Sequence, residues 1–286
     1  MASIRLLRGR IKSAKNIAQI TKAMEMVSAS KMKKAQAQAM SGKLYAQKIF
    51  DMVMELGSKT DITNHPLLTR PAHMTGKRLV IIFSTNKGMC GALNTNLFRY
   101  FLQQYPTYKT HDYVVLGKKA SEMIVRIGGT LTADFSDTPH FSDIVPALSE
   151  MATTQFLKGT YDGVDLLYSE FFNALKQSPR KKTILPLSIT AVDTEKKGTE
   201  EEFLIEPSVT EVFDELLPHY LENQIRDAAL QAEASEHSAR MVAMRNATDN
   251  AVSLIGEFTL MYNKARQEKI TGEILDIITA RLAVEG

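Results

Sequence analysis

Cysteine and long apolar runs are the scarcest features of this 286-residue sequence. Its one cysteine, Cys90, excludes a disulfide framework or a cysteine-rich metal site within the chain. No apolar run approaches the roughly 18 residues that a membrane-spanning helix needs, and the block Leu79–Phe83 is typical in length. The first residues, MASIRLLRGRIK, thread charges among apolar side chains and do not resemble a secretory signal peptide. What remains is an ordinary globular composition, 44% hydrophobic and 23% charged.

Motifs for nucleotide binding are also missing. Neither G-x-G-x-x-G nor G-x-x-x-x-G-K-[ST] occurs in the sequence. The loop STNKGMCGALN (84–94) follows a predicted strand, where doubly wound folds bind phosphate, but its only glycines are Gly88 and Gly91. We interpret this loop as a tight turn and Cys90 within it as a packed small residue.

Candidate catalytic and metal-binding groups are equally weak. Ser235-Glu236-His237-Ser238 contains the residue types of a hydrolase triad, but neighbours on one helix point in different directions. Glu233 and His237 form a single i,i+4 pair, which supplies too few ligands for a metal site. We therefore predict no catalytic, cofactor-binding or metal-binding residue.

Proline is absent from both ends of the chain, and apolar residues recur there at three- and four-residue steps. The first such stretch runs from Ser3 to about Leu56 and predicts a helix roughly 80 Å long. The second follows Pro218 and predicts a helix over 219–284, roughly 100 Å long. Two ordinary helices that break near Ser41-Gly42 are the alternative for the first stretch.

The middle of the sequence alternates short β-rich runs with amphipathic segments of 10–16 residues, which is typical of α/β crossovers. The predicted strands are 78–84, 113–116, 130–135, 164–170 and 183–189, and the predicted helices are 93–105, 118–127 and 142–157. We predict an inserted Rossmann-like, mostly parallel α/β domain flanked by antiparallel N- and C-terminal helices. The predicted divisions are an N-terminal helix at 1–57, an α/β domain at 76–200 and a C-terminal helix at 208–286.

Charge and small residues predict that the two terminal helices pair in a coiled coil. Residues 1–48 carry a net charge of +10 and residues 200–286 a net charge of −10, so we expect these charges to face one another. Both helices place alanine where a zipper has leucine or isoleucine, which permits a close approach. These alanines are Ala14, Ala18, Ala35 and Ala39 in the first helix and Ala228, Ala232, Ala239, Ala243, Ala247 and Ala251 in the second.

Four long strings of the sequence resemble the gamma subunit of F-type ATP synthases. They are ITKAMEMVSASKMKKAQ (20–36), STNKGMCGALN (84–94), SEHSARMVAMRNATDNA (235–251) and YNKARQEKITGEI (262–274). The resemblance covers the chain from end to end and in the right order. It departs from the family in the second string, where an acidic residue, an arginine and a glycine are replaced by Asn86, Lys87 and Ala92.

The resemblance implies a non-catalytic central rotor that couples proton-driven rotation to ATP synthesis or hydrolysis. Its expected partners are the ring of three alpha and three beta subunits, the epsilon subunit and the membrane ring of c subunits, with one copy per complex and no nucleic acid. It also implies a peripheral position on the cytoplasmic side of a bacterial cell membrane, held indirectly through the c-ring. No cofactor is expected.

The resemblance further implies which residues contact the stator. Met24 and its neighbours in 20–27 are expected to face a beta-subunit lever, beside Arg240 and Gln267. Arg266, Gln267 and Thr271 match the family's contacts with a beta-subunit loop, and Glu273 is assigned to the same polar network.

Two other functions compete with this one on the residues alone. One is a generic coiled-coil scaffold around an α/β domain. The other is a nucleotide-dependent enzyme whose basic arm, including Lys31-Met32-Lys33-Lys34, positions a nucleic acid. The second requires a phosphate-binding loop and stacking aromatic side chains, and the first 44 residues contain no aromatic residue.

Overall fold

The computed structural model describes residues 4–59, 65–69, 74–138, 141–187 and 206–285. The chain folds into two compact units: unit 1 comprises Met1–Ser28 and Arg240–Gly286, and unit 2 comprises Ala29–Ala239. Two helices, α1 (Ile4–Lys59) and α5 (Val209–Glu285), each contribute residues to both units. The predicted end of the α/β domain at residue 200 lies outside the described residues.

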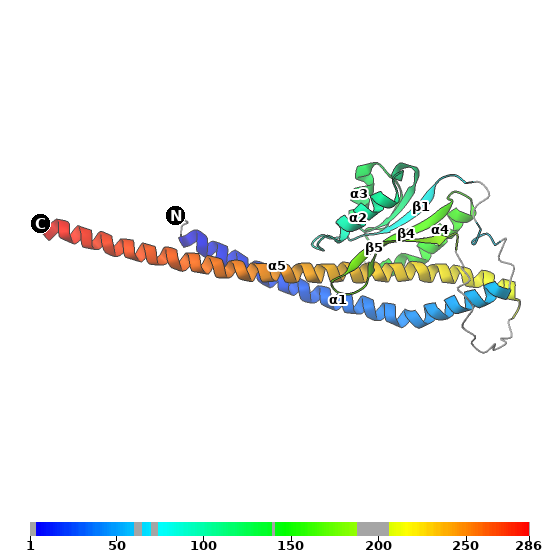
Figure 1. Ribbon diagram of the computed structural model, residues 1–286, viewed down its shortest axis with the longest axis horizontal. Coiled ribbons are helices and arrows are strands. Elements are labelled where there is room, and N and C mark those ends of the chain that lie inside the picture. The colour runs from blue at the N-terminus through cyan, green and yellow to red at the C-terminus, as the bar shows by residue number, and fades with distance from the viewer. Residues whose placement is uncertain (1–3, 60–64, 70–73, 139–140, 188–205, 286) are drawn as a thin grey trace. The chain divides into compact units, whose positions relative to one another are not determined.

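Unit 2 contains a five-stranded sheet with the strand order β3-β2-β1-β4-β5 (Figure 1). Four strands run parallel: β1 (Arg78–Phe83), β2 (Asp112–Leu116), β3 (Thr130–Asp134) and β4 (Gly163–Phe171). The fifth, β5 (Gln177–Leu185), pairs with β4 in the antiparallel direction. The predicted mostly parallel α/β fold class is therefore confirmed.

Helices cover both faces of this sheet, which explains why its inner strands are continuously apolar. On one face, α2 (Leu93–Gln104) and α3 (Lys118–Ile127) bury Leu97, Phe101 and Ile124 against the sheet. On the other face, α4 (Val145–Leu157) packs with parts of α1 and α5 in a second core cluster. Phe50 of α1 lies 6.2 Å from Tyr220 of α5 between ring centroids in this unit.

The prediction of a single first helix is confirmed, since α1 passes through Ser41-Gly42 without a break. Two other boundaries differ from their sequence predictions. The helix α5 begins at Val209, ten residues before the predicted 219, and contains Pro218 in its interior. At its start, the backbone N–H of Glu211 donates to Ser208 Oγ at 3.2 Å and caps the first turn. Strand β5 begins at Gln177, six residues before the predicted 183, because an edge strand rich in lysine, arginine and proline lacks an apolar pattern.

All ten alanines of the predicted seam are buried or half-buried. Two of them, Ala228 and Ala232, belong to the core cluster that includes β4 of the sheet. None of the helices in the part of the chain that the structure describes is both long enough and apolar enough to cross a membrane.

A buried charge network holds the sheet together at the start of β1 and β4. Asp165 is 0% exposed and accepts two hydrogen bonds from Arg78, from Nε at 2.7 Å and from Nη2 at 2.6 Å. The hydroxyls of Tyr105 and Thr183 donate to the same carboxylate at 2.8 and 2.7 Å. Burial opposes its ionisation, but the hydrogen bonds and charge of Arg78 outweigh burial and lower the pKa of Asp165.

Replacing Asp165 should therefore destabilise the chain strongly. We expect Asp165→Asn to lower the free energy of unfolding by about 3 kcal/mol, because it leaves the Arg78 guanidinium without its counter-charge. The matched control is Glu170→Gln, which removes a carboxylate of β4 that pairs with the more exposed Arg180 of β5 and should cost less than about 1 kcal/mol. Denaturant unfolding measures both, and equal losses would contradict the network's importance.

The same substitution should remove a pH dependence. An aspartate whose pKa is lowered by folding stabilises the folded state above its ordinary pKa of about 4 and loses that contribution as the pH falls further. The stability difference between the wild type and Asp165→Asn should therefore shrink as the pH is lowered below about 4. Unfolding curves at several pH values measure it, and a difference that stays constant would show that the carboxylate is not preferentially ionised.

Candidate interaction surface

Unit 1 is an antiparallel pair of helices whose register is fixed by polar contacts. Thr21 of α1 and Thr248 of α5 share a hydrogen bond of 2.7 Å between their hydroxyls. Arg8 Nη2 donates to the Tyr262 hydroxyl at 3.0 Å, and the guanidinium of Arg10 lies 5.8 Å from the centre of the Phe258 ring. As α1 advances from Arg8 to Thr21, its partners on α5 recede from Tyr262 to Thr248, by about the same number of residues, which defines antiparallel pairing.

This register shows that the expected pairing of the basic head with the acidic tail is wrong in unit 1. The segment of α5 opposite α1, from Arg240 to Ala265, contains only two acids, Asp249 and Glu257. All eleven lysines and arginines of residues 1–48 are exposed. The acids of the tail are concentrated before Arg240 and after Ala265, so the net charge of a whole segment did not indicate which residues meet.

Met24 and Arg240 lie at neighbouring levels of this helix pair. Met24 is half-buried and one turn beyond Thr21, whereas Arg240 is 9% exposed and about two turns from Thr248 in the same direction. From the rise of a helix, the two residues are roughly 8 Å apart along the axis. The structure therefore places this predicted pair within about two helical turns of each other.

Gln267 does not join them, which corrects the expectation that it lies beside Met24. Arg240 and Gln267 belong to the same helix and are separated by roughly 40 Å of helix axis. Met24 pairs at the level of Thr248 and Arg240, so it is far from Gln267 as well. The similarity of short strings identified the residues but not their level along the helix.

The remaining predicted residues lie near the C-terminal end of α5 and are exposed. Gln267 and Thr271 share one face of the helix with Ile274 and Ile278, and Arg266 and Glu273 share the adjacent face with Ile270 and Ile277. The Glu273 carboxylate is 3.4 Å from Lys269 Nζ, an exposed i,i+4 ion pair. Polar groups and exposed isoleucines thus alternate on this segment, which suits a surface that exchanges partners.

The edge of the sheet where related folds bind phosphate is filled by the chain itself. Three successive N–H groups at the start of α3 are capped by three successive residues of the loop after β1. Ala120 N donates to Ser84 Oγ at 2.8 Å, Lys119 N to the Thr85 carbonyl at 3.1 Å and Lys118 N to Asn86 Oδ1 at 3.0 Å. The positive end of the helix therefore has its acceptors in place without an anion.

Gly117 allows this close contact. Its φ is +98°, and a Cβ at this position would lie 2.2 Å from the carbonyl oxygen of Ser84. Any other residue would force the loop away from the helix. No local sequence pattern indicates this role of Asn86 and Gly117, because the loop and the helix are more than thirty residues apart.

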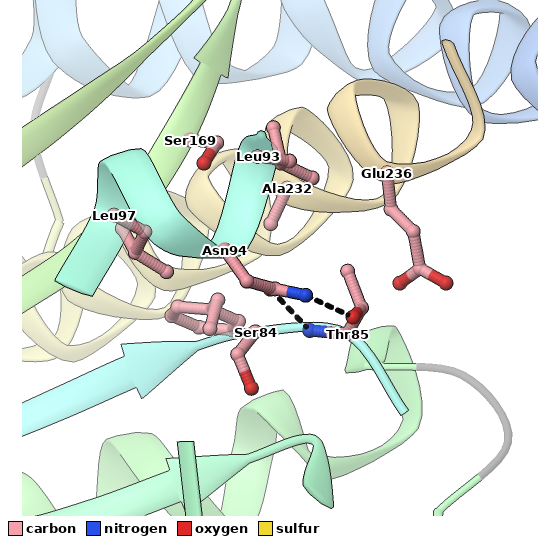
Figure 2. Close-up of a pocket in the computed structure, with 9 residues that line it drawn as sticks. Ser84, Thr85, Leu93, Asn94, Leu97, Ser169, Ala232 and Glu236 are labelled. Atoms are coloured by element: carbon pink, nitrogen blue, oxygen red, sulfur yellow. Dashed lines mark hydrogen bonds between the residues drawn. The ribbon is translucent and has the colours of Figure 1, made fainter. Parts of the chain in front are cut away.

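A small cavity of about 10 Å³, room for roughly one water molecule, lies at the end of β1 between α2 and α5. Figure 2 shows Asn94 and Thr85 hydrogen-bonded to each other at its mouth, with Asn94 Nδ2 donating to Thr85 Oγ1 at 2.7 Å. The cavity is smaller than the sites that hold small molecules, and Cys90, which is 3% exposed, packs against Asn94 with Nδ2 and Sγ 3.4 Å apart. The arrangement does not favour a nucleotide-dependent enzyme.

The triad-like string is explained by structural hydrogen bonds. Ser235 Oγ donates to the Ser169 carbonyl and Ser238 Oγ to the Ala174 carbonyl, both at 2.8 Å. Both serine protons are thus engaged by backbone oxygens. Among the described residues, no group of three histidine, cysteine, aspartate or glutamate side chains has the arrangement that a metal ion requires.

Comparison with known proteins gives matches along the full chain. A family model described as ATP synthase matches residues 3–284. Proteins named ATP synthase gamma chain are 42% identical in Opitutus terrae and 40% in Herpetosiphon aurantiacus, each covering 99% of both chains. The gamma chain of Legionella pneumophila is 35% identical over 99% of this chain and 100% of its own length.

Solved structures share the fold at lower identity. A chain from the Euglena gracilis mitochondrial ATP synthase, in the structure described as OSCP/F1/c-ring in rotational state 3, has a TM-score of 0.67 at 22% identity. The match covers 98% of this chain and 94% of that chain. A chain from a Tetrahymena thermophila mitochondrial ATP synthase structure, described as central stalk and c-ring, has a TM-score of 0.57 at 22% identity and covers 80% of this chain and 99% of that chain.

The register of unit 1 can be tested by cross-linking. We expect the pair Thr21→Cys and Thr248→Cys to form a disulfide on oxidation, because their side chains touch. The matched control pairs Thr21→Cys with Thr259→Cys, an exposed threonine of the same helix about 16 Å further along, and should not close. Mass spectrometry identifies the linked peptides, and preferential closure of the control would refute the register.

The capping role of Asn86 predicts opposite effects for two substitutions. Asn86→Ala should lower the free energy of unfolding by about 1 kcal/mol, because Lys118 N loses its acceptor. Asn86→Asp should retain the acceptor and add a favourable charge at the helix N-terminus, so its stability should equal or exceed that of the wild type. Thermal unfolding compares them, and equal losses in both variants would contradict the cap.

Proposed function

Since this chain belongs to the ATP synthase gamma chain family, we propose that it is the central-stalk rotor of an F-type ATP synthase. In this role it couples rotation of the c-ring, driven by protons, to ATP synthesis or hydrolysis at the beta-subunit sites. The observation that carries the proposal is the family match over residues 3–284, together with relatives of the same length at 35–42% identity. The antiparallel helix pair and the α/β unit are features that such a rotor requires.

The proposed partners follow from this role. One copy of the chain would stand in the ring of three alpha and three beta subunits and would bind epsilon and the c-ring. Its association with the membrane is then indirect, on the cytoplasmic side of a bacterial cell membrane. The finding that no described helix suits a membrane span is consistent with that position.

We propose that the chain has no catalytic activity of its own. The capped start of α3 and the bonded hydroxyls of Ser235 and Ser238 support this. Coupling then depends on which conformation of each beta subunit the rotor contacts best at a given angle, because a ligand shifts an equilibrium only through its differential affinity for the alternative states.

Two levels of unit 1 supply the proposed stator contacts. Met24 and Arg240 form one level, and Arg266, Gln267, Thr271 and Glu273 form another near the C-terminal end of α5. The exposed cations of α1, which have few acids opposite them, add an electrostatic attraction for acidic stator loops. Each level can therefore be altered separately.

Reconstitution tests the proposed function directly. The purified chain should not hydrolyse ATP, whereas a mixture with alpha and beta subunits should hydrolyse it with rotation of a bead attached to the chain. Co-purification with a tag on this chain should recover alpha, beta and epsilon. Hydrolysis by the chain alone, or a mixture in which the bead does not turn, would exclude the rotor function.

Met24→Lys should impair coupling, because a lysine at this half-buried level adds an ion pair between the rotor and the stator that must break at each step. The ratio of ATP synthesis to hydrolysis in membrane vesicles should fall. The matched control is Met26→Lys, at a methionine of the same helix that is 59% exposed and points to the other side of α1. An unchanged ratio for Met24→Lys, or an equal fall in the control, would contradict the assignment.

A further inference from the structure

Three polar side chains share one face of α5 and all bond to the backbone of a single hairpin. Gln231, Ser235 and Ser238 follow the i, i+4, i+7 spacing of one helix face. The hairpin consists of β4, β5 and the turn 172–176 between them. We call the three residues the latch.

Each latch residue reaches a different point of the hairpin. Gln231 Oε1 accepts from Phe171 N at 3.1 Å, and Ser235 Oγ donates to the Ser169 carbonyl at 2.8 Å. Ser238 Oγ donates to the Ala174 carbonyl at 2.8 Å and accepts from Gln177 Nε2 at 3.3 Å. The bonds therefore hold the end of β4, the turn and the start of β5 to one helix.

The hydroxyls of other α5 residues behave differently. Ser253, Thr259 and Thr279 are exposed, and each donates to the carbonyl four residues earlier in its own helix. Ser235 and Ser238 are both 0% exposed and bond outside the helix. This contrast shows that the latch is not the usual behaviour of hydroxyls along α5.

The helix lies close to the sheet next to the latch. Ala228, Ala229 and Ala232 are all buried in the core cluster that includes β4. Figure 2 places Ala232 beside Ser169 and Leu93, with α5 crossing the ends of the strands. Small side chains allow the approach, but apolar packing alone permits neighbouring registers of similar energy.

Directional bonds to fixed backbone atoms remove that freedom. A shift of α5 by one residue, about 1.5 Å along its axis, would break all the latch bonds. It would leave the carbonyl of the buried Ser169 and that of the half-buried Ala174 without these partners. The hairpin is itself continuous with the sheet, because β4 and β5 pair along their full lengths and β4 pairs with β1. A load on the sheet therefore reaches α5 through a contact with one allowed register.

We propose that the latch makes the sheet and the unit 2 part of α5 (209–239) one rigid body, and that it carries the torque between them. The inference rests on the proposed function, because only a rotor places a shear load on this contact. The proposal assigns a mechanical role to the latch residues, which touch neither a nucleotide nor another subunit in the proposed rotor assembly. Gln231, Ser235 and Ser238 are positioning residues in this sense.

The first test is a disulfide across the latch. In a complex reconstituted with alpha, beta, epsilon and the membrane sector in vesicles, the chain carries Ala174→Cys and Ser238→Cys. If α5 and the hairpin move as one body, oxidation should leave the rates of ATP synthesis and hydrolysis no lower than those of the reduced sample, in which Ser238→Cys has already removed one latch hydroxyl. A loss of turnover on oxidation that reductant restores would overturn the proposal, because the contact would then have to move during rotation.

The second test weakens the latch. Ser235→Ala combined with Ser238→Ala should retain hydrolysis by the complex without the membrane sector but lose ATP synthesis in vesicles, where the full load crosses the contact. Ser253→Ala is the matched control, since it removes an exposed hydroxyl from the same helix, and it should behave as the wild type. Unchanged ATP synthesis in a double variant whose unfolding temperature is also unchanged would refute the proposal that the latch carries torque.

The disulfide variant serves as the second measurement if the double alanine variant does not fold, because it adds a bond and its two redox states are compared in one sample.

Failure of the inference differs from failure of the proposed function. If the wild-type chain does not restore rotation with alpha and beta, the rotor function itself is wrong. If it does, and either latch test gives its contrary result, only the latch is wrong.

Discussion

The small-residue face of α5 is the constraint on which the rest of the structure depends. Ala228, Ala229 and Ala232 have no side chain beyond Cβ, so the helix backbone comes close enough to the sheet for serine and glutamine side chains to reach strand-end backbone atoms. A leucine at any of these positions would separate the two elements. The core of unit 2 and the latch both require that short separation.

The same residue type acts in unit 1, where Ala14 and Ala251 are buried between α1 and α5. There the close approach allows Thr21 and Thr248 to bond through short side chains. Polar pairs between closely packed helices specify one register, whereas a wholly apolar seam tolerates slippage. The two units thus use one physical device: alanine sets the distance and short hydroxyl side chains set the register.

Periodicity predicted the elements well and their ends less well. The apolar runs of β1, β2 and β4 identified strands because both faces of these strands are covered. The start of β5 was missed because an edge strand is partly exposed and carries polar side chains that prevent pairing with other chains. Its Pro179, Arg180 and Lys181 therefore do not form an apolar pattern. The interior Pro218 looked like a boundary, although a helix that is packed along its length tolerates the loss of one hydrogen bond.

The site was predictable only where a property is local to the sequence. Resemblance predicted Met24, Arg240, Arg266, Gln267, Thr271 and Glu273 as contact residues. The levels at which they lie depend on a register that Arg8 and Tyr262 fix from opposite ends of the chain. Total charge suggested a pairing that this register does not produce. The roles of Asn86, Gly117 and Ser235 were hidden for the same reason, since each partner lies more than thirty residues away.

The burial of Cys90 has a consequence for optical work on the molecule. The only native thiol of the chain is 3% exposed and is packed beside Asn94. A maleimide dye added to the folded protein would therefore meet only thiols that an experimenter has introduced on the surface. The chain thus has no exposed native thiol, a condition that other proteins reach only after their cysteines have been removed. Fluorophores can therefore be placed on α1, α5 or the sheet without altering the loop that holds Cys90.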